Sequence, residues 1–555
     1  MTAIKDFNGS RPSVTLRQGT YLGIEVSEEY PRPLLQFLGV PYGLSTAGAR
    51  RFRPPLPVEP SSKTFDASKY GSRCPSGVEE GTAGFGEDCL NANIYLPKDN
   101  YPSKKLLPVV ISVHGGAFNF GTGSDRDVPS LIGWSEEPIV GVSFNYRTGV
   151  FGFLPCTLTA KLGLLNVGLK DQALLFEWVQ ENIHKFGGDK NNVTLLGFSA
   201  GAHSVGHHLM HNTNKPPPFQ RVIIESGAST ARAIYPYNNP THEVQFGDFL
   251  LKLGLTEVPS DRLLETLQSL SASRIQKASE SVFETYNPSV RWPFQPVIDG
   301  PGGIIPTAPL QAWKEGRWHK IPILTGFNTN EGAMFVPHNM STSTQFTSFF
   351  RILLPGLSEE DLKVLNETYP DPLTNPSSKY KETRPDVGPQ FYRVEQAYGH
   401  FAYVAPVRQT ADFAAAGPSP VYLYHFALKS DLVGGAGHGD HALFATHSIS
   451  SHHETWKEVA GLMHACWASF IATGDPNAIK GRFPDRPIWP KYLSSSRKLA
   501  LFGADHEFAP SFGAIKASAM SIVNSSWATE ECEYWWARTK KFEENPPETR
   551  HFSNL

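Results

Sequence analysis

The chain has 555 residues, of which 40% are hydrophobic, 12% aromatic and 19% charged. This composition is typical of a globular protein with a large core and excludes a disordered chain. The formal net charge is −3 and no block of like charge occurs, so we expect no nucleic-acid partner. No apolar run reaches the roughly 18 residues of a membrane helix, and we expect no membrane span.

The first residues, MTAIKDFNGSRPSV, lack the apolar segment of a secretory signal. The chain as given therefore predicts an intracellular protein, and a secreted one if a leader precedes it. Its five cysteines are too few and too scattered for a disulfide framework or a zinc site. Cys74 and Cys89 bracket a short glycine-rich loop and can pair, whereas Cys466 lies in the apolar helical segment MHACWASF and is expected to be buried.

Apolar and turn residues alternate before about residue 60, which predicts a meander of strands. From about 90 to 230, the short apolar runs LPVVISV, PIVGVSFNY, NVTLLGF and RVIIESG alternate with helical segments. Such βαβ units predict a largely parallel sheet, which KIPILTGF and PVYLYHF at 320–327 and 420–426 extend. We expect a single α/β catalytic domain over residues 1–555, with helical insertions at about 240–290 and 340–415 covering the active-site edge of the sheet and a polar tail after about 540.

A possible nucleophile lies in the segment Gly197-Phe198-Ser199-Ala200-Gly201, between the strand VTLLGF and a helical segment. In a G-x-S-x-G turn the backbone is too tight for a side chain at either glycine, and the central serine is exposed. The Ala200 N–H, at the positive end of the helix dipole, is a predicted oxyanion donor. A chain of this length carries about 0.2 such matches by chance, so this motif alone does not establish a serine enzyme.

A second turn contains His114-Gly115-Gly116-Ala117-Phe118 and follows the strand LPVVISV. Small residues there let backbone N–H groups approach a reacting oxygen closely. Gly116 and Ala117 are therefore the other predicted oxyanion donors.

A serine hydroxyl needs a base and a group that orients the base. Downstream of Ser199, Glu331 lies in the post-strand loop GFNTNEG and His438 lies in the glycine-rich segment GGAGHGDHALF. The order serine, acid, histidine is that of α/β-hydrolases. A glutamate in such a loop is more often a solvated surface charge, and its own surroundings would not single out Glu331; Asp440 is an alternative acid in the wrong order. The histidines that compete with His438 are His441, His447, His452 and His453. They lack a tight ligand framework, so we expect neither a metal nor a cofactor.

Together these segments resemble the type B carboxylesterases, the family of cholinesterases, carboxylesterases and lipases within the α/β-hydrolase fold. The resemblance covers nearly the whole chain and includes FLGVPYG, RFRPP, EDCLNANIYLP, HGGAF, NYRTGVFGFL, FGGDKNNVTLLGFSAG, PVIDG, GFNTNEG and HGDHALF. It implies that Ser199, Glu331 and His438 are nucleophile, acid and base, with Gly116, Ala117 and Ala200 as the oxyanion hole. It also implies a Cys74–Cys89 disulfide, a supporting role for Ser226, and structural ion pairs of Arg51 with Glu87 and of Arg147 with Asp171.

The departures from the family concern the substrate. The 74–89 loop lacks the tryptophan with which cholinesterases hold a quaternary ammonium, and Phe198 replaces a frequent glutamate, so choline esters are not expected. His441 replaces a frequent acidic residue. An apolar substrate pocket is expected from Phe118, Phe198, Val290, Trp292 and Phe294, although Trp292 fits a core position equally well.

The sequence therefore predicts a carboxylesterase that hydrolyses small-molecule esters through an acyl-serine intermediate. An acyltransferase, a thioesterase or a lactone-forming biosynthetic enzyme would use the same triad and is the alternative. A non-catalytic adhesion protein on this fold is disfavoured because all three triad positions are filled. Natural substrate and oligomeric state are not predicted.

Overall fold

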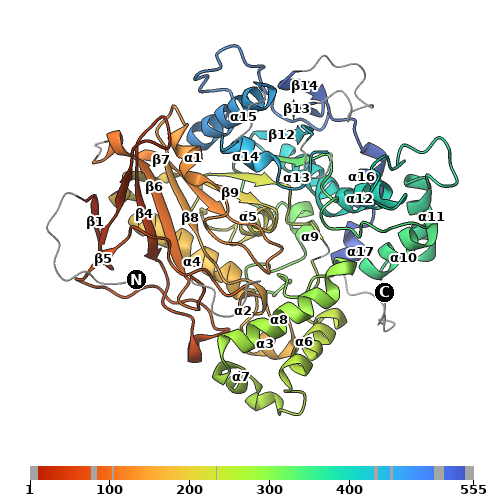
Figure 1. Cartoon of the computed structure of the whole chain (residues 1–555), viewed down its shortest axis with the longest axis horizontal. Helices are drawn as coiled ribbons and strands as arrows, with labels where there is room; N and C mark the ends of the chain where they lie inside the picture. The colour runs from red at the N-terminus through yellow and green to blue at the C-terminus, as the bar shows by residue number, and fades with distance from the viewer. Residues whose placement is uncertain are drawn as a thin grey trace.

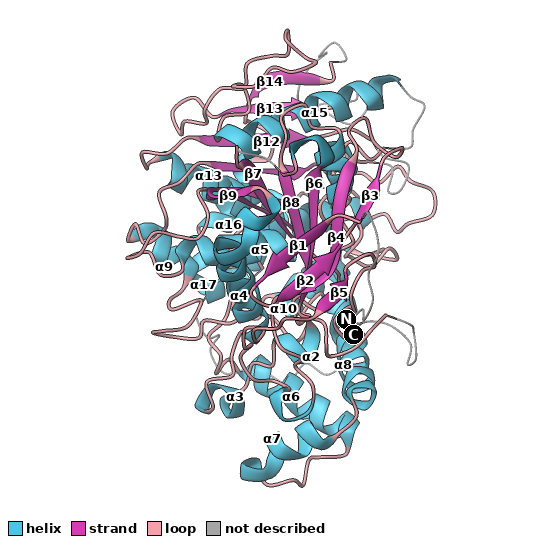
Figure 2. Cartoon of the chain, turned by 90° about the vertical axis from the view of Figure 1, so that its left-hand side faces the viewer, coloured by secondary structure: helices cyan, strands magenta, loops and turns pink. Residues whose placement is uncertain are grey.

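The computed structural model describes residues 11–76, 84–102, 105–232, 234–429, 435–449, 454–504 and 518–543. Within these residues, eleven strands form one large sheet and three form a small one (Figures 1 and 2). In spatial order the large sheet contains β14 (Met520–Asn524), β13 (Lys498–Phe502), β12 (Val421–Phe426), β11 (Ile323–Asn328), β10 (Arg221–Glu225), β9 (Gly188–Phe198), β7 (Leu107–Val113), β8 (Val140–Phe144), β6 (Asn91–Pro97), β4 (Leu34–Pro41) and β3 (Ile24–Val26). The small sheet contains β1 (Ser13–Leu16), β2 (Gly19–Leu22) and β5 (Thr64–Asp66).

The centre of the large sheet is parallel and its edges are antiparallel. All neighbours from β8 through β7, β9, β10, β11 and β12 to β13 run parallel. Strands β14, β6, β4 and β3 pair antiparallel. Parallel strands are covered on both faces and therefore read as continuous apolar runs, which is why the central strands were predictable. The polar-apolar run NANIYLP of β6, the strand β13 and the edge strand β14 were not predicted.

Side chains of alternate strand positions enter two separate cores. On β9, Leu195 belongs to one core and Leu196 to the other, and on β10 Ile224 and Ile223 divide in the same way. Helices α4 and α5 pack on the first core, while α1 and α15 pack on the second. The period of two along a strand thus produces a three-layer arrangement of helices, sheet and helices.

Both predicted insertions are helical. Figures 1 and 2 show α6, α7 and α8 grouped at one end of the molecule. The helices are α1 (Val128–Gly133), α2 (Gly149–Gly152), α3 (Thr157–Lys161), α4 (Val167–Asn182), α5 (Ala200–Met210), α6 (Pro240–Leu253), α7 (Ser260–Ser269), α8 (Ala272–Tyr286), α9 (Pro309–Lys314), α10 (Ser343–Leu353), α11 (Glu359–Thr368), α12 (Phe391–Gly399), α13 (Ala405–Ala415), α14 (His441–Ala445), α15 (Glu454–Thr473), α16 (Thr529–Trp536) and α17 (Thr539–Glu543). A π-helical turn, His400–Val404, joins α12 to α13. In the part of the chain that the structure describes, no helix is both long and apolar enough to span a membrane.

One disulfide and two buried ion pairs fix the loops around the sheet. Cys74 and Cys89 are joined, with an S–S distance of 2.00 Å, and Cys466 is free and buried in α15. Arg51 pairs with Glu87 through two bonds of 2.6 Å. Arg147 pairs with Asp171 through bonds of 2.8 and 2.6 Å, with both side chains buried. These are the pairs that the resemblance implied, and they lie outside the serine site. The tail beyond residue 543 lies outside the described residues.

Candidate active site

The turn at residues 197–201, here called the serine elbow, joins β9 directly to α5. Ser199 has φ 55° and ψ −123°, a conformation that non-glycine residues seldom adopt. A Cβ on Gly197 would lie 2.3 Å from the Gly201 carbonyl oxygen, and a Cβ on Gly201 would lie 2.0 Å from that of Val113. The two glycines of the motif are therefore required by close backbone approach, as the sequence indicated.

Three residues from distant segments form one continuous hydrogen-bonded chain. The Oγ of Ser199 lies 2.8 Å from Nε2 of His438, and Nδ1 of His438 lies 2.5 Å from Oε2 of Glu331. Ser199 lies at the elbow, Glu331 in the turn after β11 and His438 in the loop before α14. All three side chains are buried. A hydroxyl, an imidazole and a carboxylate in this order can activate the hydroxyl as a nucleophile.

The carboxylate of Glu331 is held by two further donors. The Ser226 hydroxyl donates to its Oε1 at 2.6 Å, and the Asn328 N–H donates to the same oxygen at 2.7 Å. Ser226 follows β10 and itself has a positive φ of 52°. The Asn328 side chain also donates to the Gly437 carbonyl at 2.5 Å, so the acid loop and the histidine loop are tied together. The sequence pointed to Ser226, whereas Asn328 was missed although GFNTNEG is rich in asparagine.

The HGGA turn presents two N–H groups without partners in the described structure. Gly116 and Ala117 have φ values of 102° and 51°. The Gly116 carbonyl accepts from the Asn119 N–H at 2.9 Å, and the Ala117 carbonyl accepts from the Gln295 amide at 2.8 Å. No hydrogen bond among the described residues engages the N–H of Gly116 or Ala117. Ala200 begins α5, so its N–H has no intrahelical acceptor. These are the three N–H groups that the sequence predicted as oxyanion donors; it did not name Gln295, which follows Phe294.

Aromatic rings surround the imidazole. Ring centroids of Tyr403, Phe198 and Phe335 lie 4.4, 4.8 and 5.0 Å from that of His438. Tyr403 lies in the π-helical turn, an irregularity that is frequent at functional sites. Burial raises the pKa of Tyr403, which keeps this phenol neutral. Phe198 was predicted for the substrate pocket, whereas Tyr403 and Phe335 were not, because nothing local in their segments marks them.

The competing acids and histidines have other partners. His441 is buried 3.5 Å from the Glu225 carboxylate, which also pairs with Arg126. Burial alone would raise the pKa of Glu225, but Arg126 and His441 outweigh it and lower that pKa to about 2. The Asp440 carboxylate accepts the Gly437 N–H at 2.7 Å and shapes the histidine loop. His447 contacts the Trp134 ring, and His452 and His453 lie outside the described residues.

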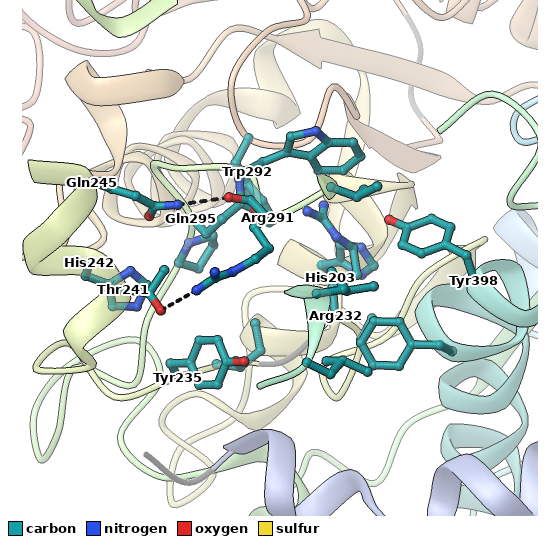
Figure 3. A pocket seen from close by; sticks show the side chains of 18 residues that line it. His203, Arg232, Tyr235, Thr241, His242, Gln245, Arg291, Trp292, Gln295 and Tyr398 are labelled. Carbon is teal, nitrogen blue, oxygen red and sulfur yellow. Dashed lines mark hydrogen bonds between the residues drawn. The ribbon is translucent and has the colours of Figure 1, made fainter. Parts of the chain in front are cut away.

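A pocket lies near the serine elbow, lined by Phe118 and His203 but by none of residues 197–201, and Figure 3 shows the side chains around it. Of the residues predicted for the substrate pocket, Phe118, Val290 and Trp292 line it and Phe198 does not. Both insertions contribute to the lining, with Thr241, His242 and Gln245 from α6, Leu353 from α10 and Tyr398 from α12. Phe294 is not among its lining residues and packs against Phe249, with ring centroids 5.9 Å apart. The sequence missed two arginines in the lining, Arg232 and Arg291.

Comparisons with known proteins identify the family of this chain. A model described as the carboxylesterase family matches residues 10–535. Secreted lipase 4 of Gibberella zeae is 32% identical over 84% of this chain and 83% of its own. Acetylcholinesterase of Electrophorus electricus is 29% identical over 88% of this chain and 84% of its own. The crystal structure of Aspergillus niger EstA superimposes with a TM-score of 0.82 at 26% identity, covering 96% of this chain and 99% of that one. The predicted α/β-hydrolase fold is confirmed, and the chain belongs to the carboxylesterase family and is a carboxylic ester hydrolase.

Proposed function

We propose that this protein is a serine carboxylesterase that forms an acyl-enzyme on Ser199. The observation that carries the proposal is the hydrogen-bonded chain from the Ser199 hydroxyl through His438 to Glu331, beside free backbone N–H groups. We further propose that residues 1–555 act as one catalytic domain, because the strands that carry these residues share one sheet.

In the first half-reaction the Ser199 oxygen attacks the ester carbonyl while its proton moves to Nε2 of His438. The carbonyl oxygen becomes an oxyanion, and the N–H groups of Gly116, Ala117 and Ala200 donate to it. When the bond to the alcohol oxygen breaks, that oxygen takes the proton from His438 and the acyl group stays on Ser199.

In the second half-reaction a water molecule replaces the alcohol. His438 takes a proton from the water as it attacks the acyl carbonyl, and returns that proton to Ser199 as the carboxylic acid leaves. Glu331 holds Nδ1–H of the imidazole throughout and stabilises its protonated form. The bonds from Ser226 and Asn328 keep the carboxylate in that position.

The proposed substrates are small-molecule carboxylic esters other than choline esters. Phe198 places an aromatic ring, and no charge, beside His438. The disulfide at Cys74 and the secreted relative support secretion, the second of the two compartment predictions. An acyltransferase or lactone-forming enzyme would differ only in the hydroxyl that replaces water.

The test of the nucleophile is a fluorophosphonate probe, which labels activated serines. We expect labelling of the native protein and none of Ser199→Ala. Hydrolysis of short p-nitrophenyl esters should fall by about four to six orders of magnitude in kcat for Ser199→Ala and for His438→Ala. Undiminished labelling of Ser199→Ala would contradict the proposal, as would full esterase activity of His438→Ala. Circular dichroism checks that both variants are folded.

A further inference from the structure

We propose that the pocket beside the serine elbow binds a carboxylate carried by the substrate, so that the preferred esters bear an acidic group remote from the reacting carbonyl. The proposal deepens the esterase function proposed above and rests on it. Arg232 and Arg291 are the groups that would bind the carboxylate.

The pocket adjoins the reacting groups through two of its lining residues. Phe118 directly follows the proposed oxyanion donor Ala117. His203 lies one turn along α5, and its backbone N–H donates to the Ser199 carbonyl at 3.0 Å. The rings of Phe118 and His203 face each other with centroids 6.2 Å apart. We infer that a substrate part directed from the serine toward these two rings reaches the pocket.

Among the described residues, the lining contains two arginines and no aspartate or glutamate. The Arg291 guanidinium donates to the Thr241 hydroxyl at 2.8 Å, and the Arg232 guanidinium lies over the Trp292 ring, 4.0 Å from its centroid. Figure 3 shows the Tyr398 hydroxyl directed toward Arg232. Within the described residues, no carboxylate forms an ion pair with either arginine.

Among the described residues, several other buried arginines have acidic partners, although Arg408 and Arg486 are buried without one. Arg51, Arg126 and Arg147 each form a bidentate pair with a glutamate or an aspartate. Arg232 and Arg291 are partly buried without such a partner. Burial lowers the pKa of Arg291, which reports that its charge is poorly solvated. A carboxylate from outside the chain would compensate both charges, and the planar guanidinium fork fits it.

Neither histidine in the lining adds to the charge. Burial lowers the pKa of His242 to about 4 and that of His203 well below its usual value, so both are neutral at pH 7. The remaining walls include the apolar side chains of Val290, Trp292 and Leu353. The pocket thus combines apolar walls with two fixed cations, which matches an apolar chain ending in a carboxylate.

The backbone at Arg232 supports a binding role. Its φ is 60°, in the left-handed region that branched or long side chains seldom occupy. Such conformations persist where the surrounding structure imposes them and are enriched at binding sites. This conformation places the guanidinium on Trp292 in the pocket.

Two pairs of esters test the proposal and identify the part of the substrate that enters. Methyl hydrogen adipate is compared with methyl hexanoate for an acid on the acyl side. The butanoate ester of 6-hydroxyhexanoate is compared with hexyl butanoate for an acid on the alcohol side. We expect kcat/KM for the acidic member to exceed that of its neutral partner by about 10- to 100-fold in at least one pair, the range of a charge-assisted hydrogen bond.

Three arginine variants locate the effect. Arg232→Gln and Arg291→Gln should each lower the acidic-to-neutral ratio of kcat/KM about 10-fold, chiefly through KM, and Arg232→Lys should retain part of it. Arg262→Gln, at an exposed position of α7, is the matched control and should leave the ratio unchanged. Adipate dianion should inhibit the native protein competitively and the Arg232→Gln variant more weakly.

A preference for the neutral ester in both pairs overturns the proposal, as does a ratio that neither glutamine variant changes. Neither result affects the esterase proposal if Ser199 is still labelled and neutral esters are still cleaved. Conversely, persistent labelling of Ser199→Ala overturns the esterase proposal, whereas tight adipate binding by that variant would still support the anion pocket.

Discussion

Ser199, Gly116 and Ala117 all have a positive φ, and each contributes an atom that faces the reacting carbonyl in the proposed mechanism. The two strained turns come together because Gly201 of the elbow packs on the Val113 carbonyl, at the end of the strand that leads into the HGGA turn. A glycine at this place is thus a catalytic requirement, because a side chain would separate the nucleophile from its oxyanion donors.

The sharpest single-residue test is Gly116→Ala. A Cβ there would lie 2.2 Å from the Phe120 carbonyl oxygen at a φ of 102°, so the turn must move. Losing one oxyanion donor lowers kcat by about 10²- to 10³-fold. Steady-state kinetics with a p-nitrophenyl ester measures this loss.

Gly254→Ala is the control for backbone strain alone. Gly254 has a φ of 68° at the end of α6, and nothing lies within 4 Å of its added Cβ. We expect a stability loss of about 1 kcal/mol and unchanged kcat. Equal kcat for native protein and Gly116→Ala would refute the assigned role of the HGGA turn.

Between elements, charged side chains fix the loops that carry the site. Arg147 follows β8 and binds Asp171 of α4 through its side chain, while the Arg147 N–H donates to the same carboxylate at 3.0 Å. The Arg147 guanidinium also donates to the Arg53 carbonyl at 2.7 Å. Helix α4 is therefore attached to two loops by one carboxylate, and removing that carboxylate leaves a buried, unpaired guanidinium.

Asp171→Asn should lower the free energy of unfolding by about 3 to 5 kcal/mol, because a buried charge loses its partner. Glu181→Gln on the same helix is the matched control. Its exposed carboxylate lies 3.9 Å from Arg17, and its loss should change stability by about 0.5 kcal/mol or less. Urea unfolding followed by fluorescence measures both variants, and an equal effect of the two would contradict this account of α4.

Across the whole molecule, an unusual number of histidines is buried in the neutral form. The chain has 19 histidines. Burial lowers the pKa of His207, His425 and His464 to about 3, and that of His242 and His400 to about 4. In the unfolded chain a histidine has a pKa of about 6.5. Below that pH the unfolded state binds more protons than the folded state, so stability falls as the pH falls.

We therefore expect the free energy of unfolding to be lost progressively below about pH 6.5, by up to about 1.4 kcal/mol per pH unit for each such histidine. The urea midpoint measured from pH 8 to pH 5 tests this expectation. His207→Leu removes one buried imidazole whose ring nitrogens have no hydrogen-bond partner among the described residues. The variant should therefore take up about one proton fewer on unfolding, and its free energy of unfolding should fall less steeply with falling pH. His184→Gln, at an exposed position, is the control. Equal midpoints at pH 8 and pH 5 would contradict the prediction.

The sequence was sufficient to predict those features whose physical cause lies in neighbouring residues. The apolar runs of β7, β9, β10 and β11 reflect burial on both faces, and the glycines around Ser199 reflect the steric limits of one tight turn. The order of Ser199, Glu331 and His438 along the chain, with the resemblance, was enough to nominate these residues. Strand β6 escaped prediction because its run NANIYLP begins with polar asparagines, whose side-chain amides donate to the Ser72 carbonyl and to Ser143 of β8.

By itself, then, the sequence determined the parallel sheet, the serine elbow and the three residues proposed as a triad. Only the tertiary structure decided what surrounds them, namely Tyr403 against His438 and the cations Arg232 and Arg291 in one pocket. The reason is that turns and periodicity are encoded by neighbouring residues, whereas burial, ring contacts and unpaired charge depend on segments hundreds of residues apart. No local pattern distinguishes an arginine that faces a pocket from one that faces solvent.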